Sequence, residues 1–205
     1  MDPRKKERME RMDGTVIREL AEKSRSCRGY APTEVKKETL TKLTDFARLC
    51  PSGGNLQALR YKLSWESETN DRVLKATRWG AALPERHLPD PGKGARAYIV
   101  ICLDTAAAAE ATPAMYCDVG IAAQTICLAA AEKGLASLMI MNFSREGVAN
   151  ALSIDGRFRP LLVIALGVSA EKTALEERKE GMPPYWRDEN DVHHVPKWPL
   201  EKVII

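Results

Sequence analysis

Apolar residues spaced three or four positions apart predict several amphipathic helices. Apolar residues recur at helical spacing over residues 15–23 and again over 35–50, where Thr33 is the expected N-cap of the second helix. The same periodicity predicts helices around residues 71–79 and 144–152. Each of these helices is expected to bury one face against a common core.

Continuous apolar runs predict strands. Residues 97–103, 135–141 and 161–166 are rich in β-branched and large aliphatic side chains, which is typical of interior strands. Residues 61–65 predict a shorter strand. A mixture of helices with four or five strands predicts a layered α+β domain.

Residues 118–135 give the strongest helix prediction. Asp118 is the expected N-cap, Lys133 suits the negative C-terminal end of the helix dipole, and Gly134 is the expected stop. Apolar residues cover almost every side of this helix, so it is expected to be central and buried.

The polar carboxyl-terminal segment, about residues 168–205, contains three large aromatic residues, Tyr185, Trp186 and Trp198. A disordered tail is normally poor in aromatic residues. We therefore expect an arm that lies on another surface, such as a second subunit, with its end adding to a sheet. Residues 84–94 contain too many Pro and Gly residues for regular structure and predict a surface loop.

Length and composition favour one domain over residues 15–205, preceded by a charged extension at 1–14. The chain has 205 residues, of which 44% are apolar, and a net charge of +3. This charge implies neither nucleic acid nor membrane as a partner. A DNA-binding arm at residues 1–11 is a weaker alternative, because Glu7 and Glu10 interrupt its basic run.

Cysteine and histidine usage gives no metal-site pattern. The five cysteines include no CxxC pair, which favours reduced thiols in a cytoplasmic protein, and the three histidines lack ligand partners at suitable spacing. No metal is therefore expected. No apolar run reaches the length of a membrane span, and the start of the sequence lacks the apolar core of a secretory signal.

Two short polar segments carry candidate chemistry. Arg25-Ser26-Cys27-Arg28 follows a helix and places two guanidinium groups and a hydroxyl where they can bind a phosphate. The alternative is a helix end with favourable basic residues. Lys197, in the Val-Pro-Lys-Trp segment, can also reach a phosphate, and its alternative is an ordinary surface lysine.

The segment Pro51–Gln57 predicts a bent loop with two amide side chains. Gly53 and Gly54 let backbone N–H groups face outward, and Asn55 and Gln57 each offer donors and an acceptor. That combination suits the edge of a heteroaromatic ring such as the flavin pyrimidine. The alternative is an ordinary helix-ending loop. The common nucleotide loops and the GxSxG hydrolase motif do not occur in the sequence.

Taken in order, these segments resemble the flavin-dependent nitroreductase family. The family pattern R-S-x-R-x-[FY] matches residues 25–30, and P-S-x-x-N-x-Q matches residues 51–57. The pattern D-x-G-I-A-x-Q, leading into G-L, matches residues 118–135, and an apolar strand ending in A-L-G matches at 165–167. Departures are Ser24, where many relatives have Arg, and two further positions, Ala58 and Trp198.

The resemblance implies a homodimer with two FMN sites at the interface. The implied fold is a nitroreductase-like layered α+β fold whose central mixed or antiparallel sheet is flanked by helices, with the carboxyl-terminal arm exchanged between subunits. NADH or NADPH would reduce FMN, and a quinone or nitroaromatic acceptor would then take the hydride through flavin N5 in a ping-pong cycle. Since the flavin carries the chemistry, no catalytic side chain is expected.

The same resemblance implies which residues contact FMN. The phosphate and ribityl chain would lie near residues 25–28 and Lys197, the partner subunit would supply the 51–57 loop, and residues 140–142 would line the other side of the ring with a backbone N–H near N5. The expected contacts are Arg25, Ser26, Cys27, Arg28, Pro51, Ser52, Gly53, Asn55, Gln57, Ile140, Met141, Asn142 and Lys197.

Two alternative functions remain open at this point. One is a non-catalytic dimer that binds, stores or senses FMN without turnover. The other is a specialised family member that dehalogenates a substrate or destroys flavin. The sequence indicates neither the physiological acceptor nor a preference between NADH and NADPH.

Overall fold

The centre of the molecule is a four-stranded antiparallel sheet. The structure, a computed structural model, describes residues 15–83 and 86–205. The strands lie in the order β1 (Leu59–Ser64), β2 (Ala97–Asp104), β4 (Phe158–Gly167) and β3 (Ala136–Ile140). β2 and β4 are therefore interior strands, which explains their continuous apolar sequences, and β1 and β3 are edge strands. The prediction of an interior strand at residues 135–141 is wrong, because β3 pairs only with β4 among the described strands of this sheet.

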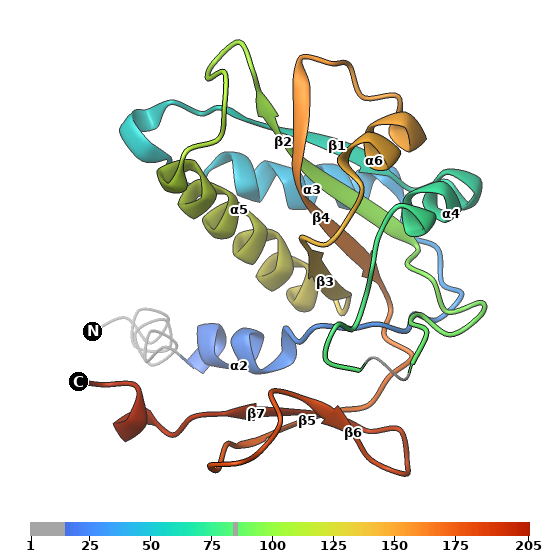
Figure 1. The fold of residues 1–205 in the computed structure, drawn as a ribbon, viewed down its shortest axis with the longest axis vertical. Helices are drawn as coiled ribbons and strands as arrows, with labels where there is room; N and C mark the ends of the chain where they lie inside the picture. Colours follow the sequence, from blue (N-terminus) through green and yellow to red (C-terminus); the bar gives the residue numbers. More distant parts are fainter. Residues whose placement is uncertain (1–14, 84–85) are drawn as a thin grey trace, which may run out of the picture.

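Helices cover both faces of this sheet (Figure 1). One face carries α3 (Lys37–Arg48) and α5 (Pro113–Glu132), and the other carries α4 (Ser67–Lys75) and α6 (Arg145–Leu152). Because successive strand residues point to opposite faces, the interior strands supply two separate apolar clusters. The α+β class and the antiparallel layered sheet predicted from the sequence are confirmed.

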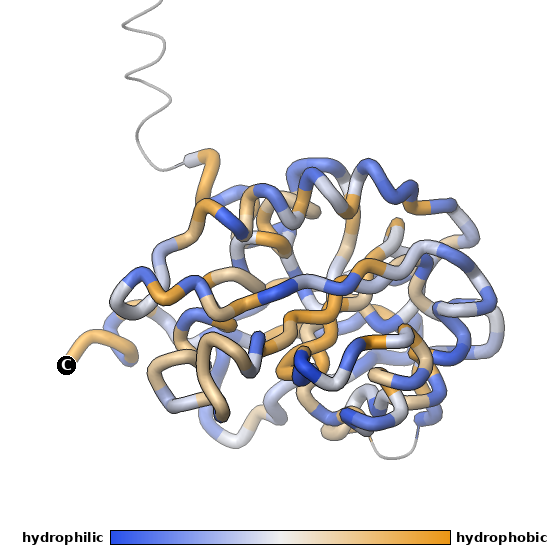
Figure 2. Tube along the Cα trace, turned by 90° about the horizontal axis from the view of Figure 1, so that it is seen from above, coloured by the Kyte–Doolittle hydropathy of each residue, from blue (hydrophilic) through white to orange (hydrophobic). Residues whose placement is uncertain are grey.

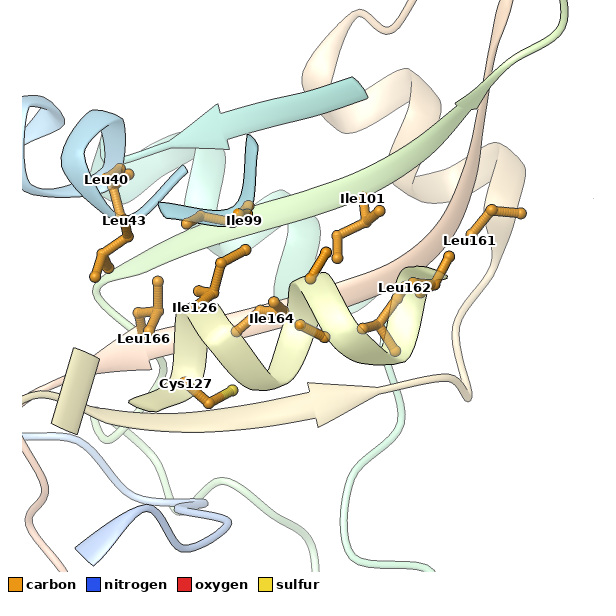
Figure 3. Packing of buried hydrophobic residues seen from close by; sticks show 14 of the residues in the cluster. Leu40, Leu43, Ile99, Ile101, Ile126, Cys127, Leu161, Leu162, Ile164 and Leu166 are labelled. Atoms are coloured by element: carbon orange, nitrogen blue, oxygen red, sulfur yellow. The ribbon is translucent and has the colours of Figure 1, made fainter. Parts of the chain in front are cut away.

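The larger cluster joins α3 and α5 to the sheet. Figure 3 shows Ile126 of α5 beside Ile99 of β2 and Ile164 of β4, with Leu40 and Leu43 of α3 at one end. All five side chains are fully buried. Burial of this apolar area is the main favourable term for the domain.

A second, smaller sheet forms the carboxyl-terminal arm. Its strands are β5 (Thr173–Glu177), β7 (His193–Lys197) and β6 (Trp186–Arg187), with β7 in the middle, and a short helix η2 (Leu200–Lys202) follows. In Figure 1 this sheet lies at the foot of the molecule, below α2 (Thr15–Lys23). The arm is thus a distinct layer beyond the main sheet.

The arm packs on its own chain. The Tyr185 hydroxyl accepts a hydrogen bond from the Ala82 backbone N–H at 3.0 Å, and Asp191 forms an ion pair with Arg86. The last eight residues, 198–205, contain no strand within this chain. Instead β7 occupies the centre of the arm sheet.

Several predicted helix boundaries are wrong. α3 begins at Lys37 with Lys36 at the N-cap position, rather than at Thr33, and α4 lies about one turn earlier than the expected 71–79. α5 begins at Pro113, where the Thr112 hydroxyl accepts the Met115 N–H at 3.3 Å. Thr followed by Pro is a strong helix start, and it makes Asp118 an interior residue.

Other predicted boundaries are confirmed. α2 spans the expected residues Thr15–Lys23, and Ser144 caps α6 by accepting the Gly147 N–H at 3.0 Å. Gly134 follows α5 with φ of 72°, a left-handed conformation that favours glycine. The charged extension predicted at 1–14 lies outside the described residues.

α5 is less buried than its apolar sequence predicted. Val119, Ala123 and Ile126 face the core, but Tyr116 and Ile121 are 36% and 40% exposed. Among the described residues it is the one helix long and apolar enough to span a membrane, by length and composition alone. In this structure one side of α5 packs on the sheet and the other side remains uncovered.

Gly167, the last residue of β4, allows Tyr30 to pack against the sheet. A Cβ atom at position 167 would lie 2.7 Å from Cδ1 of Tyr30. Tyr30 cannot move aside easily, because it is 1% exposed and its hydroxyl donates to the Cys27 carbonyl at 3.0 Å. Two segments of the sequence pattern, around residues 30 and 167, are thus in direct contact.

Replacing Gly167 with Ala should therefore destabilise the fold. We expect Gly167→Ala to lower the free energy of unfolding by about 1–3 kcal/mol, the usual cost of overpacking a core. Gly156→Ala is the control, because nothing lies within 4 Å of its Cβ position. Urea unfolding of both variants measures the difference, and equal stability of the two would contradict this account of Gly167.

Candidate functional site

A cavity of about 340 Å³, here called the basic cavity, lies between the segment after α2, the edge strand β3, the helix α5 and the arm. It brings together four of the residues predicted to hold a phosphate, although Lys197 is far from the others in the sequence. Its lining consists of Ser24, Arg25, Ser26, Arg28, Gln124, Cys127, Ser137, Met139, Pro184, Tyr185, His193, Val195 and Lys197.

The lining of the basic cavity favours an anionic ligand. It includes three cationic side chains, Arg25, Arg28 and Lys197, and no carboxylate among the described residues. Three buried nitrogen atoms here have no hydrogen-bond partner: Nε of Arg25, Nε of Arg28 and Nδ1 of His193. Buried donors are almost always satisfied, so these atoms fit a ligand with acceptor oxygens.

Arg28 is held by the arm. Its backbone N–H donates to the Glu171 carboxylate at 2.8 Å, and its guanidinium lies 4.7 Å from the centre of the Tyr185 ring. Nη1 of Arg28 is 3.1 Å from Nε2 of His193. The Arg28 side chain is 7% exposed, so these contacts replace most of its hydration.

His193 is the least expected residue in this cavity. It is 1% exposed, and burial, with the nearby charges of Arg28 and Arg187, lowers the pKa of His193 to about 4. The ring is therefore neutral at pH 7. Because guanidinium has no acceptor, Nη1 of Arg28 donates to Nε2 of His193, and the ring proton resides on Nδ1.

A buried ion pair lies next to His193 in the arm. Arg187 and Glu171 pair with each other, and their side chains are 5% and 6% exposed. Glu171 also accepts the Arg28 N–H, so one carboxylate joins the arm to the start of the domain. The buried cations and the carboxylate thus offset one another.

Along β3 the side chains alternate between the basic cavity and the core. Ser137 and Met139 line the cavity, whereas the Ile140 side chain is 3% exposed within the smaller apolar cluster. The Ile140 side chain therefore does not face the basic cavity. Met141 is 66% exposed, and the Asn142 carbonyl accepts the Arg78 N–H at 2.9 Å.

Cys27 points away from the basic cavity. Its Sγ lies 3.1 Å from the Gly29 carbonyl oxygen and 3.4 Å from the Ser169 hydroxyl. Burial raises the pKa of Cys27 to about 11, so the thiol stays protonated at neutral pH. Cys27 contributes its backbone instead, since its N–H donates to the Ser137 carbonyl at 3.0 Å.

A second hollow, here called the amide groove, has a volume of about 450 Å³ and lies between α3, β1 and α5. Pro51, Ser52 and Gln57 of the predicted ring-edge loop line it, together with Asp118 and Arg60. Gly53 and Asn55 form the short helix η1 (Gly53–Asn55) at the exposed tip of the loop.

The loop beside the amide groove has an unusual backbone. Gly54, Asn55 and Gln57 have φ of 57°, 54° and 50°. Such left-handed residues are held by their surroundings: the Gln57 N–H donates to the Ser52 hydroxyl at 3.1 Å, and the Gly53 N–H donates to the Asp118 carboxylate at 3.0 Å. Asp118, expected to cap a helix, instead anchors this loop.

The two hollows are separate on one chain. Asp118 and Ala122 of α5 line the amide groove, whereas Gln124 and Cys127, farther along the same helix, line the basic cavity. The predicted phosphate residues and the predicted ring-edge residues therefore do not meet in one pocket of a single chain.

Comparisons with known proteins agree with the observed fold. An Archaeoglobus fulgidus protein, assigned by its name to the NADH dehydrogenase/NAD(P)H nitroreductases, is 25% identical over 178 residues, which cover 85% of this chain and 94% of its own. The crystal structure of a nitroreductase family protein from Clostridium difficile 630 has 26% identity and a TM-score of 0.62, covering 91% of this chain and 95% of that one.

A third relative is an FMN-dependent nitroreductase from Clostridium difficile R20291, with 25% identity and a TM-score of 0.60 over 75% of this chain and 87% of that one. The fold and the basic cavity define a layered α+β protein with a cavity lined by cationic side chains beside an edge strand. The chain belongs to the nitroreductase family, whose sequence pattern matches residues 21–168.

The basic cavity also contains residues that the sequence analysis did not name as site residues, among them Gln124, Met139, Tyr185 and His193. Strand alternation is the signal for Met139, because it shares a face with Ser137. No local signal marks His193, whose partner Arg28 is 165 residues away in the sequence.

The buried neutral His193 should make the fold sensitive to acid. Its folded pKa of about 4 lies below the unfolded value of 6.5, so between these values the unfolded chain binds the additional proton. We expect stability to be unaffected by this group above pH 6.5 and to fall as the pH drops from 6.5 towards 4.

His193→Gln should remove this part of the pH dependence. The measurement is urea unfolding of wild type and variant at several pH values between 4 and 7. His87→Gln is the control, because His87 is exposed. Identical pH slopes for wild type and His193→Gln would show that His193 is not held neutral by the fold.

Proposed function

We propose that this protein is an FMN-dependent NAD(P)H oxidoreductase of the nitroreductase or quinone reductase type. The observation that carries the proposal is the basic cavity, where buried cationic groups have unsatisfied donors and no carboxylate is among the lining residues. An FMN-dependent relative with 25% identity supports the choice of ligand. Bound FMN would accept a hydride from NADH or NADPH and pass it to a quinone or nitroaromatic acceptor.

The chain's own residues would hold the charged end of the cofactor. Arg25, Arg28 and Lys197 offer charge-assisted donors to a phosphate, and the Ser26 hydroxyl adds a neutral one. His193 fixes one nitrogen of the Arg28 guanidinium, leaving its Nε free to donate. These groups would orient FMN without a catalytic side chain.

The flat end of the cofactor would be held by amides. Pro51, Ser52, Asn55 and Gln57 belong to an exposed loop at the amide groove, and we propose that they reach a ring bound to the partner subunit. Residues 140–142 would line the other side of the ring, with the exposed Met141 backbone near N5. The separation of the two hollows on one chain supports a site built from two chains.

Exposed apolar side chains support a homodimer. Val16 and Ile17 of α2 are 51% and 62% exposed, and Tyr116 and Ile121 leave one side of α5 uncovered. Apolar patches of this kind mark interaction surfaces. A second copy of the chain would bury them.

We propose that exchange between subunits involves only the end of the arm. Residues 169–197 are tied to their own domain through Glu171, Tyr185 and Asp191. The apolar residues after them remain exposed, Leu200 at 69% and Ile204 at 66%, and Figure 2 shows the carboxyl terminus as a projecting hydrophobic segment. This end would reach across to the partner.

The test is a visible spectrum of the purified protein with added FMN, before and after anaerobic addition of NADPH or NADH. We expect a bound flavin spectrum that bleaches on reduction and recovers with a quinone. A bound flavin that stays oxidised with both nucleotides would favour a protein that stores or senses flavin. Absence of any bound flavin would overturn the proposal.

Lys197 offers a test of the phosphate contact. Lys197→Gln should weaken FMN binding by about three- to tenfold, the loss expected for one charge-assisted hydrogen bond at a partly exposed site, and should leave riboflavin binding nearly unchanged. Lys179→Gln, an exposed lysine on the same arm, is the matched control. Fluorescence titration with both flavins measures the effect, and an equal loss for riboflavin would argue against a phosphate contact.

A further inference from the structure

Arg60 of β1 joins the amide loop to the main sheet. Its Nη1 donates to the Gln57 carbonyl oxygen at 2.8 Å and to the Leu59 carbonyl oxygen at the same distance. Gln57 is the last left-handed residue of the loop, with φ of 50°. A hydrogen bond to its carbonyl therefore fixes the peptide plane that follows the strained residue.

Arg60 is itself held by a buried carboxylate. Its Nη2 lies 3.2 Å from Oδ2 of Asp104, at the end of β2, and the Asp104 side chain is 2% exposed. The Asp104 backbone N–H also donates to the Ala58 carbonyl at 2.9 Å. Asp104 thus holds the end of the loop through two contacts, one with the Arg60 side chain and one with the Ala58 carbonyl.

Arg157 balances the charge of Asp104. Nε and Nη2 of Arg157 donate to the two oxygens of Asp104 at 2.7 and 2.8 Å, a bidentate pair that fixes the carboxylate plane. The pKa of Asp104 is held below its usual range by this hydrogen bonding with Arg157 and by the nearby Arg60. The carboxylate therefore stays ionised, and its fixed plane aims Oδ2 at Arg60.

The loop entrance has its own anchor. The Gly53 N–H donates to both oxygens of Asp118, at 3.0 and 3.2 Å. Residues 53–57 are exposed. Left-handed conformations of residues other than glycine are strained and persist only where the surroundings enforce them. At the exit of this loop, two hydrogen bonds to Gln57 supply that constraint: its N–H donates to the Ser52 hydroxyl, and its carbonyl accepts from Arg60.

We propose that Arg60, backed by Asp104, is a positioning residue that holds Gln57 in its left-handed conformation and so presents the Gln57 amide to the flavin ring. This proposal rests on the proposed function, since the amide needs a flavin to address. Arg60 touches no reacting atom in this scheme. It acts through the backbone of Gln57.

The first arm of the test uses flavin-free protein. Arg60→Met keeps the length of the side chain and removes its donors, and hydrogen–deuterium exchange of the peptide covering residues 52–58 should become about three- to tenfold faster. Arg72→Met is the matched control, because Arg72 is 49% exposed against 50% for Arg60 and binds only neighbours on its own helix. Unchanged exchange in Arg60→Met would overturn the proposal.

The second arm is a double-mutant cycle on FMN affinity. Arg60→Met should raise the Kd for FMN about five- to tenfold when Gln57 is present, and less than about twofold in the Gln57→Ala background. Equal effects in both backgrounds would show that Arg60 acts independently of Gln57 and would overturn the proposal. If wild-type protein binds no FMN, the proposed function fails, and the exchange measurement still decides whether Arg60 holds the loop.

Discussion

Burial of the Arg28 guanidinium is the constraint on which the site depends. A buried cation without partners is strongly destabilising, so the chain must bring acceptors to it. The arm supplies them: Glu171 accepts the Arg28 backbone N–H, Nε2 of His193 accepts from the side chain, and the Tyr185 ring covers it. The basic cavity therefore forms only when the arm is docked on the domain.

The same contacts leave three buried nitrogen atoms without hydrogen-bond partners. His193 uses one nitrogen on Arg28 and leaves Nδ1 unpartnered, and Arg25 and Arg28 each keep an unpartnered Nε. Unsatisfied buried donors cost free energy, and a bound anion would remove this cost by accepting their hydrogen bonds. The amide groove, lined by other residues of α5, adds the Ser52 hydroxyl and the Gln57 amide to charged side chains of both signs. This division suits a ligand with a charged end and a flat polar end.

Much of the fold was readable from local patterns, and the errors have physical causes. The apolar runs of β2 and β4 identified the interior strands correctly because both faces of these strands are buried. Asp118 was misassigned because it fits an N-cap by residue type, while Thr112 and Pro113 begin the helix a turn and a half earlier. The carboxylate of Asp118 binds the Gly53 N–H, a contact across 65 residues that no local pattern reports.

The sequence by itself determined the fold class, the interior strands and the two polar segments that face the hollows, because hydrophobic periodicity and turn residues act over a few positions. Only the tertiary structure decided which of these residues share a cavity. It placed Lys197 and Arg25 in one cavity, turned Cys27 towards Ser169, and brought in His193. Those outcomes depend on the docking of the arm on residues more than a hundred positions earlier, and such long-range contacts leave no local signature in the sequence.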